Sequence, residues 1–137
     1  MMSSPERPDG VPLIAIIAGH GDFAAGMISA VEHISGAGRR FVGVSNRDLS
    51  PAALVERLGA AVRESAASVV FTDLPAGSCT IAARRLQRDL PELLVIAGTN
   101  LPILLNFALG GDIPGAVDRA LSKARDALAA HVDTGTR

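Results

Sequence analysis

Residues 13–27 read LIAIIAGHGDFAAGM: an apolar run, a glycine-rich turn and the beginning of an amphipathic stretch. The apolar run, residues 13–18, shows no alternation of polar and apolar side chains, which is typical of a strand buried on both faces of a sheet. Similar runs occur at residues 41–44, 68–72 and 93–97, and each is followed by a turn and a helical pattern. Strands and helices that alternate in this way connect by right-handed crossovers into a parallel sheet covered on both faces.

Five helices are predicted to follow these strands. The clearest begins at Ser50, a good N-cap that precedes Pro51 at the first helical position. A short fourth helix is expected at residues 101–109. The residues expected to face inward recur at helical spacing in the other four helices. In the helix between a cap at Asp22 and a stop at Gly36 and Gly38, they are Phe23, Met27, Val31 and Ile34. In the helix that begins after Ser50, they are Leu54, Leu58, Ala61 and Val62. In the helix of residues 77–88 they are Ile81 and Leu86, and in that of residues 113–130 they are Val117, Leu121, Ala124 and Leu128.

The predicted fold is therefore α/β: a three-layer α/β/α domain with a mainly parallel central sheet of four or five strands. A single domain, residues 11–131, accounts for nearly all of the 137 residues, because two independent cores rarely fit in this length. The polar residues 1–10 are expected to be disordered or extended, and residues 132–137 are expected to fray.

The composition argues against several classes of function. The net charge is -1, and the chain has no Trp or Tyr and only four Phe, which argues against nucleic-acid binding. One cysteine and three scattered histidines give no metal-binding spacing, and no cofactor is expected. The lone cysteine and an N-terminus unlike a signal peptide favour the cytoplasm. Residues 93–111 are uncharged, but their glycines, asparagines and proline favour a buried strand and helix over a membrane span.

His20 is the first candidate functional residue. It directly follows the first strand, lies between Gly19 and Gly21, and precedes a helix N-terminus. Parallel α/β sheets bind ligands outside the carboxyl ends of their strands, at the point where the strand order reverses. The two glycines leave the imidazole open, and a neutral imidazole nitrogen is a nucleophile that can accept a phosphoryl group.

Asp73 ends the third strand at the same edge of the sheet. If the first and third strands are neighbours, its carboxylate can reach His20, fix the ring tautomer and leave the second nitrogen free. The alternative is that Asp73 only caps its own turn. Ser78 follows Gly77 at the start of the third helix, where its hydroxyl and nearby N–H groups can bind phosphoryl oxygens, or where it is simply a first-turn residue.

Other residues have simpler interpretations. Cys79 lies at a helix N-terminus, which favours a thiolate, but a lone cysteine in such surroundings is more often a packing residue. Residues 19–24 fit the dinucleotide fingerprint G-x-G-x-x-[G/A], although the second strand lacks the acidic residue that holds a ribose. His33 and His131 are expected at the surface.

Taken in order, these segments resemble the enzyme IIA domain of the mannose family (mannose/fructose/N-acetylgalactosamine type) of the phosphoenolpyruvate-dependent sugar phosphotransferase system (PTS). The similarity covers roughly residues 13–128. Residues 17–21 (IAGHG) and 24–27 (AAGM) resemble the family's phosphorylation-site loop and first helix. Residues 69–74 (VVFTDL) resemble the strand that ends in its aspartate, residues 76–78 (AGS) its Gly-Gly-Ser/Thr turn, and residues 95–102 (VIAGTNLP) its fourth strand and turn.

The resemblance implies that His20 is transiently phosphorylated and that Asp73 orients its ring. It also implies that Ser78, together with Gly77 and Gly21, binds the phosphoryl group. Family members take the phosphoryl group from the phosphocarrier HPr and pass it to a IIB protein, which serves a IIC/IID membrane pair. They are cytoplasmic, associate at most peripherally with a membrane permease, and are commonly homodimers.

The sequence departs from the family pattern around Ser78. Ala76 stands where a first glycine is usual, and Pro75 where the family often has a large side chain. Residues 79–81, Cys79-Thr80-Ile81, stand where Pro-Phe-Asn often follows the serine or threonine, so the asparagine is missing. These changes bear on the fit of a partner more than on the chemistry. Two other functions therefore stay open: a regulatory phosphohistidine protein that reports PTS status without transport, and a nucleotide- or phosphate-binding module.

Overall fold

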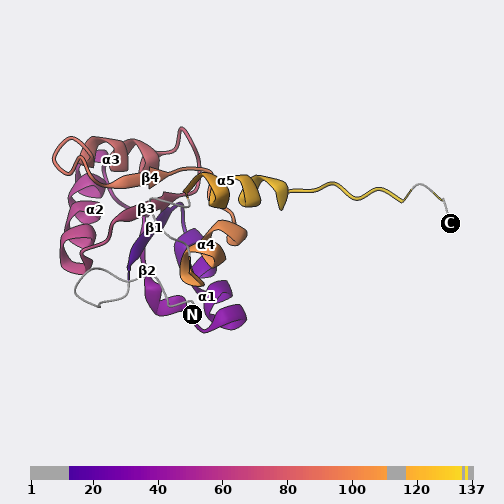
Figure 1. The fold of residues 1–137 in the computed structure, drawn as a ribbon. Coiled ribbons are helices and arrows are strands. Elements are labelled where there is room, and N and C mark those ends of the chain that lie inside the picture. Colours follow the sequence, from indigo (N-terminus) through magenta and orange to yellow (C-terminus); the bar gives the residue numbers. More distant parts are fainter. Residues whose placement is uncertain (1–12, 111–116, 134, 136–137) are drawn as a thin grey trace.

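A computed structural model describes residues 13–110, 117–133 and 135 (Figure 1). Strands and helices alternate from the start of the chain, as predicted. The elements are β1 (Ala15–Gly19), α1 (Phe23–Ser35), the 3-10 helix η1 (Gly38–Arg40), β2 (Phe41–Ser45), α2 (Pro51–Ser65), β3 (Val69–Thr72), α3 (Ser78–Leu86), β4 (Leu94–Ile96), α4 (Leu101–Ala108) and α5 (Val117–Asp126).

The four strands form one parallel sheet in the order β2-β1-β3-β4. The central strands β1 and β3 are completely buried, as their apolar sequences predict. Burial on both faces was also expected of the second strand, and there the expectation is wrong: β2 lies at an edge of the sheet, and Val42 and Gly43 are exposed. Because all strands are parallel, their carboxyl ends meet at one edge of the sheet.

Each face of the sheet is covered by its own group of helices (Figure 1). On one face, α1, α4 and α5 share a hydrophobic core with Phe41 and Phe71 of the sheet, and Phe107 of α4 completes an aromatic cluster with ring centroids 5.6–6.4 Å apart. On the other face, α2 and α3 pack on side chains such as Ile16 and Val70. The predicted three-layer α/β/α fold is confirmed.

Local sequence signals position most of the helix ends. The Ser50 hydroxyl accepts a hydrogen bond of 3.1 Å from the Ala53 N–H, and Gly36 ends α1 with a φ of 73°. The Asn100 side chain caps α4. Residues 94–96 and 101–108 form the predicted strand and helix, but β4 lies at an edge of the sheet and only Ile96 of its three residues is buried. Asp22 precedes α1 but makes no capping hydrogen bond. None of the described helices is both long and apolar enough to cross a membrane.

Three residues predicted to face inward are exposed: Ile34, Ile81 and Leu128. The buried face of α1 is centred on Ala24 and Val31. Ile34 lies about 80° around the helix from Ala24 and is therefore away from the centre of that face. Five positions, or about 140°, separate Ile81 from Leu86, so one face of α3 cannot bury both. Leu86 is buried, and Ile81 is 55% exposed.

The last helix is shorter than predicted. It ends at Asp126, which places Leu128 beyond it with 86% of its surface exposed, whereas Ala124 is buried. The predictions for residues 1–10, 113–116, 134 and 136–137 lie outside the described residues, as does that for the side chain of Val117.

A matched pair of alanine variants tests this assignment of buried and exposed faces. Leu58 is completely buried, so Leu58→Ala should lower the free energy of unfolding by about 2–5 kcal/mol. Ile81→Ala removes an exposed side chain of similar size and should change it by about 0.5 kcal/mol or less. Urea denaturation of both variants measures the difference, and equal losses would contradict the assignment.

Candidate functional site

Three loops meet at the carboxyl edge of the sheet. They follow β1, β2 and β3 and contain His20, Asn46 and Asp73 respectively. Because β2 lies on one side of β1 and β3 lies on the other, the strand order reverses between β1 and β3. This is the point at which parallel α/β sheets bind their ligands. His20 and Asp73 therefore flank the position where the sequence analysis expected a site.

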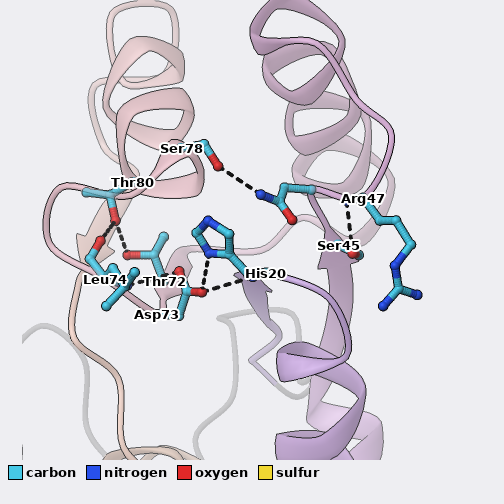
Figure 2. A network of polar contacts seen from close by, with 9 residues as sticks. His20, Ser45, Arg47, Thr72, Asp73, Leu74, Ser78 and Thr80 are labelled. Atoms are coloured by element: carbon cyan, nitrogen blue, oxygen red, sulfur yellow. Dashed lines mark hydrogen bonds and ion pairs between the residues drawn. The ribbon is translucent and has the colours of Figure 1, made fainter.

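Asp73 binds His20 through both its ring and its backbone (Figure 2). Nδ1 of the imidazole lies 2.8 Å from Oδ2 of Asp73, and the His20 backbone N–H donates to the same oxygen at 2.9 Å. The other oxygen, Oδ1, accepts the Leu74 N–H at 2.9 Å. The carboxylate thus caps its own turn and also reaches His20, so both interpretations of Asp73 from the sequence describe the same side chain.

The Asp73 side chain is more buried than the His20 side chain that it contacts. The Asp73 side chain is 10% exposed, whereas that of His20 is 51% exposed. A carboxylate accepts hydrogen bonds, so Nδ1 carries the ring proton and Nε2 keeps its lone pair. The second ring nitrogen points away from Asp73, toward the side on which Ser78 lies (Figure 2). An open nucleophilic nitrogen opposite a fixed N–H can form a bond to an incoming group.

The environment of Asp73 keeps it ionised. Burial acts to raise the pKa of this carboxyl, but hydrogen bonds from the ring and the backbone N–H of His20 outweigh it and hold the pKa below its ordinary value of 3.8. An ionised carboxylate stabilises any positive charge that develops on the imidazole.

Two buried threonines hold the turn that carries Asp73. The Thr80 hydroxyl donates to the backbone oxygen of Leu74 at 2.5 Å and therefore accepts from the Thr72 hydroxyl, 2.6 Å away (Figure 2). These bonds connect the end of β3 to the first turn of α3. The position of the carboxylate thus depends on the packing of the sheet and not on the loop alone.

Gly77 and Ser78 lie next to the His20 ring. A Cβ on Gly77 would come within 3.4 Å of Cε1 of His20, which shows how closely the α3 N-terminus approaches the imidazole. The first N–H groups of a helix have no acceptor within the helix and attract anions. The Ser78 hydroxyl accepts a hydrogen bond of 3.0 Å from Nδ2 of Asn46. The prediction from the sequence did not include Asn46 as a site residue. Its position directly after β2, at the carboxyl end of a parallel strand, could have indicated it.

Gly21 and its neighbours form the side of the site next to β2. Gly21 has a φ of +52°, which favours glycine, and a Cβ there would lie 3.3 Å from the Arg47 guanidinium. Arg47 forms an ion pair with Asp22 at 3.2 Å, and both side chains are exposed. An exposed pair of this kind contributes little stability. It does place a positive group beside the loop that carries His20.

The remaining candidates do not join this site. Cys79 is completely buried, and desolvation followed by the charge of Asp73 raises the pKa of its thiol to about 11, as befits a packing residue. His33 and His131 are exposed, as expected. Among the described residues, no group of three or more His, Cys, Asp or Glu could hold a metal ion.

The geometry also disfavours a dinucleotide in the loop of residues 19–24. The N–H of His20 already donates to Asp73. In addition, the Asp73 carboxylate lies 3.0 Å from where a Gly19 Cβ would stand. A negative charge at that position repels a pyrophosphate.

Comparisons with known proteins identify the family and agree with the fold. The sequence matches the family described as "PTS system fructose IIA component" over residues 14–115. The phosphotransferase system component EIIA from Streptococcus agalactiae has 23% identity and a TM-score of 0.73, covering 86% of this chain and 96% of that one. The mannose/sorbose specific IIA subunit from Enterococcus faecalis has 20% identity and a TM-score of 0.74, covering 88% and 96%. The PTS IIA protein associated with the fucose utilization operon from Streptococcus pneumoniae has 20% identity and a TM-score of 0.73, covering 95% and 96%. No curated protein matches the sequence.

Two glycine variants test the packing of the His20 loop. A Cβ on Gly19 would lie 2.6 Å from the Phe23 ring and 3.0 Å from Oδ2 of Asp73, so Gly19→Ala should destabilise the fold by about 1–3 kcal/mol. Gly26 in α1 has nothing within 4 Å of its Cβ position, and Gly26→Ala should stabilise it by about 0.5–1 kcal/mol. Chemical denaturation distinguishes the two, and a neutral Gly19→Ala would mean that the loop is not packed as described.

The pH dependence of stability tests the charge on Asp73. Its pKa is lower in the folded chain than the ordinary value of 3.8, so the contact contributes stability above that value and loses it as the pH falls through the folded-state pKa. Asp73→Asn removes the titration. We expect the variant to be about 1 kcal/mol less stable than wild type at neutral pH, and the difference to shrink on acidification. Denaturation across this pH range measures it; a constant difference would contradict the ionised contact.

Proposed function

This chain belongs to the family of PTS system fructose IIA components, and from that premise we propose that it is a phosphocarrier that forms a phosphohistidine on Nε2 of His20. One observation supports the assignment most strongly. The imidazole is half exposed at the switch point of the sheet, and its other nitrogen, Nδ1, is held by an ionised carboxylate 2.8 Å away. This arrangement leaves one nitrogen, and only one, ready to react.

The proposed transfer is an in-line displacement between two histidines. The lone pair of Nε2 attacks phosphorus, the P–N bond of the donor histidine breaks, and the donor nitrogen recovers its electron pair. No proton leaves His20, because Nδ1 keeps its hydrogen throughout. The His20 ring becomes positively charged as the donor ring loses its charge, and the Asp73 carboxylate stabilises that charge. Donor and product bonds are alike, so the step can run in either direction.

The phosphoryl group on Nε2 carries negative oxygens that need hydrogen-bond donors. We assign this role to the Ser78 hydroxyl and to backbone N–H groups at Gly21 and in the first turn of α3. The resemblance implies Gly77 as well, but its N–H already donates to the backbone oxygen of Leu74 at 3.1 Å, so Gly77 contributes by its close approach to the ring. The closeness of Gly77 to the ring and the free N–H groups of the α3 first turn support the assignment. Charge stabilisation and positioning are the main requirements of phosphoryl transfer, which explains why a domain of this size suffices.

Family membership also suggests the partners. We propose phospho-HPr as donor and a separate IIB protein as acceptor, which in turn phosphorylates a sugar taken up through IIC and IID membrane components. This exchange takes place in the cytoplasm, peripheral to the membrane. We further propose a homodimer, as the family resemblance implies.

Labelling with phosphoenolpyruvate, enzyme I and HPr tests the phosphohistidine. We expect one acid-labile, base-stable phosphate per chain, because phosphoramidates hydrolyse in acid. His20→Ala should abolish the label, and the matched variants His33→Ala and His131→Ala should keep it, since those side chains lie exposed elsewhere. Labelling that survives His20→Ala would overturn the assignment.

The acceptor is tested by adding a IIB protein of the mannose family to the labelled chain. Loss of the label to IIB supports the transport role. A stable label in the presence of IIB would favour the regulatory alternative, in which the same phosphohistidine reports PTS status without sugar uptake.

A further inference from the structure

We propose that Asn46 is a positioning residue for phosphoryl transfer, because its side chain sets the hydroxyl of Ser78 relative to the imidazole of His20. The inference rests on the proposed function and extends it to a loop for which the sequence predicted no role. Asn46 follows β2, whereas His20 follows β1 and Ser78 begins α3. It is thus the residue through which the β2–α2 loop reaches the site.

The backbone of Asn46 is tied to the residue that precedes His20. Its N–H donates to the backbone oxygen of Gly19 at 3.1 Å, which continues the pairing of β1 and β2 by one residue. Its own backbone oxygen accepts the Leu49 N–H at 3.2 Å and closes the following turn. Asp48 within this turn has a φ of 61°, a conformation that non-glycine residues adopt at an energetic cost. The loop is therefore held in one shape relative to β1.

The side chain of Asn46 extends from this fixed backbone to α3. Nδ2 donates a hydrogen bond of 3.0 Å to Oγ of Ser78, and both residues are partly buried. A hydroxyl that accepts this bond keeps its own proton free to donate. The amide therefore directs the Ser78 proton away from Asn46, to an acceptor such as a phosphoryl oxygen on His20. Without the amide, the Ser78 side chain is free to rotate among its staggered positions.

This arrangement connects the two groups that act on the phosphoryl group. One hydrogen bond joins Asn46 to the strand that ends beside His20, and another joins it to the serine on α3. A donor that is fixed before the reaction needs no reorganisation during it, which is how preorganised groups stabilise transition states. We infer that Asn46 contributes to the rate of transfer without itself touching the reacting atoms.

Two substitutions of Asn46 separate this role from a purely structural one. Asn46→Ala removes the amide and should slow transfer from phospho-HPr by about tenfold, because the Ser78 hydroxyl is then no longer held to donate to the charged phosphoryl group. Asn46→Asp keeps the shape, but its carboxylate accepts the Ser78 proton and repels the phosphoryl group, so it should be slower than the alanine variant. If Asn46 only shaped its loop, the isosteric Asp variant would be the better of the two.

A double-mutant cycle with Ser78 provides the second readout. Because Asn46 acts through Ser78, adding Asn46→Ala to Ser78→Ala should cause almost no further loss of rate. Ser45→Ala is the matched control: its hydroxyl accepts the Arg47 N–H at 3.1 Å in the same loop, and the variant should retain the wild-type rate. Circular dichroism and thermal unfolding monitor the fold of each variant.

Each outcome bears on one claim. Independent, multiplicative losses in the cycle, an unchanged rate in Asn46→Ala, or a faster Asn46→Asp than Asn46→Ala would overturn the role of Asn46. If Asn46→Ala does not fold, the cycle is measured with Asn46→Asp, Ser78→Ala and the variant that carries both substitutions. The role of Asn46 then requires that Asn46→Asp slow transfer when Ser78 is present and have almost no further effect when Ser78 is replaced. If the wild-type chain takes no label from phospho-HPr, the proposed function itself fails, and the two failures are thereby distinguished.

Discussion

The parallel pairing of β1 with β3 is the constraint on which the candidate site depends. Ala18 and Thr72 are partners in that register, so His20, two residues after Ala18, and Asp73, one residue after Thr72, come together at the sheet edge. Both strands are completely buried, and the pairing is therefore set by the hydrophobic core and not by the loops. The contact of 2.8 Å between the two side chains follows from this register together with the turn that Thr72 and Thr80 hold.

The tasks at the site are divided among separate layers of the fold. The sheet fixes the distance from His20 to Asp73, and the buried threonine pair joins the end of β3 to α3. The N-terminus of α3, with Ser78, then lies beside the ring from the opposite side to Asp73 (Figure 2). This arrangement leaves the imidazole as the exposed member of the site. The proposed transfer from another protein requires an accessible acceptor, and the groups that orient this acceptor are more protected from solvent.

The sequence was sufficient to predict that His20 and Asp73 lie together at the sheet edge, because each follows the end of an apolar run and the strand-end rule needs only that information. It was not sufficient for Asn46, whose partner Ser78 is 32 residues away in the chain and is found only once the loops are placed. For Ile81 the prediction from the sequence was wrong. Hydrophobicity alone suggested an inward residue, and only the helical angle relative to Leu86 shows that it faces solvent.

Nitrogen NMR of the His20 ring is the decisive measurement, because it reports which ring nitrogen carries the proton. We expect a protonated Nδ1, bound to Asp73, and an unprotonated Nε2 in the free protein at neutral pH. After phosphorylation we expect a phosphorus coupling to Nε2, with Nδ1 still protonated. A ring protonated on Nε2 in the free protein, or a phosphoryl group attached to Nδ1, would contradict this expectation.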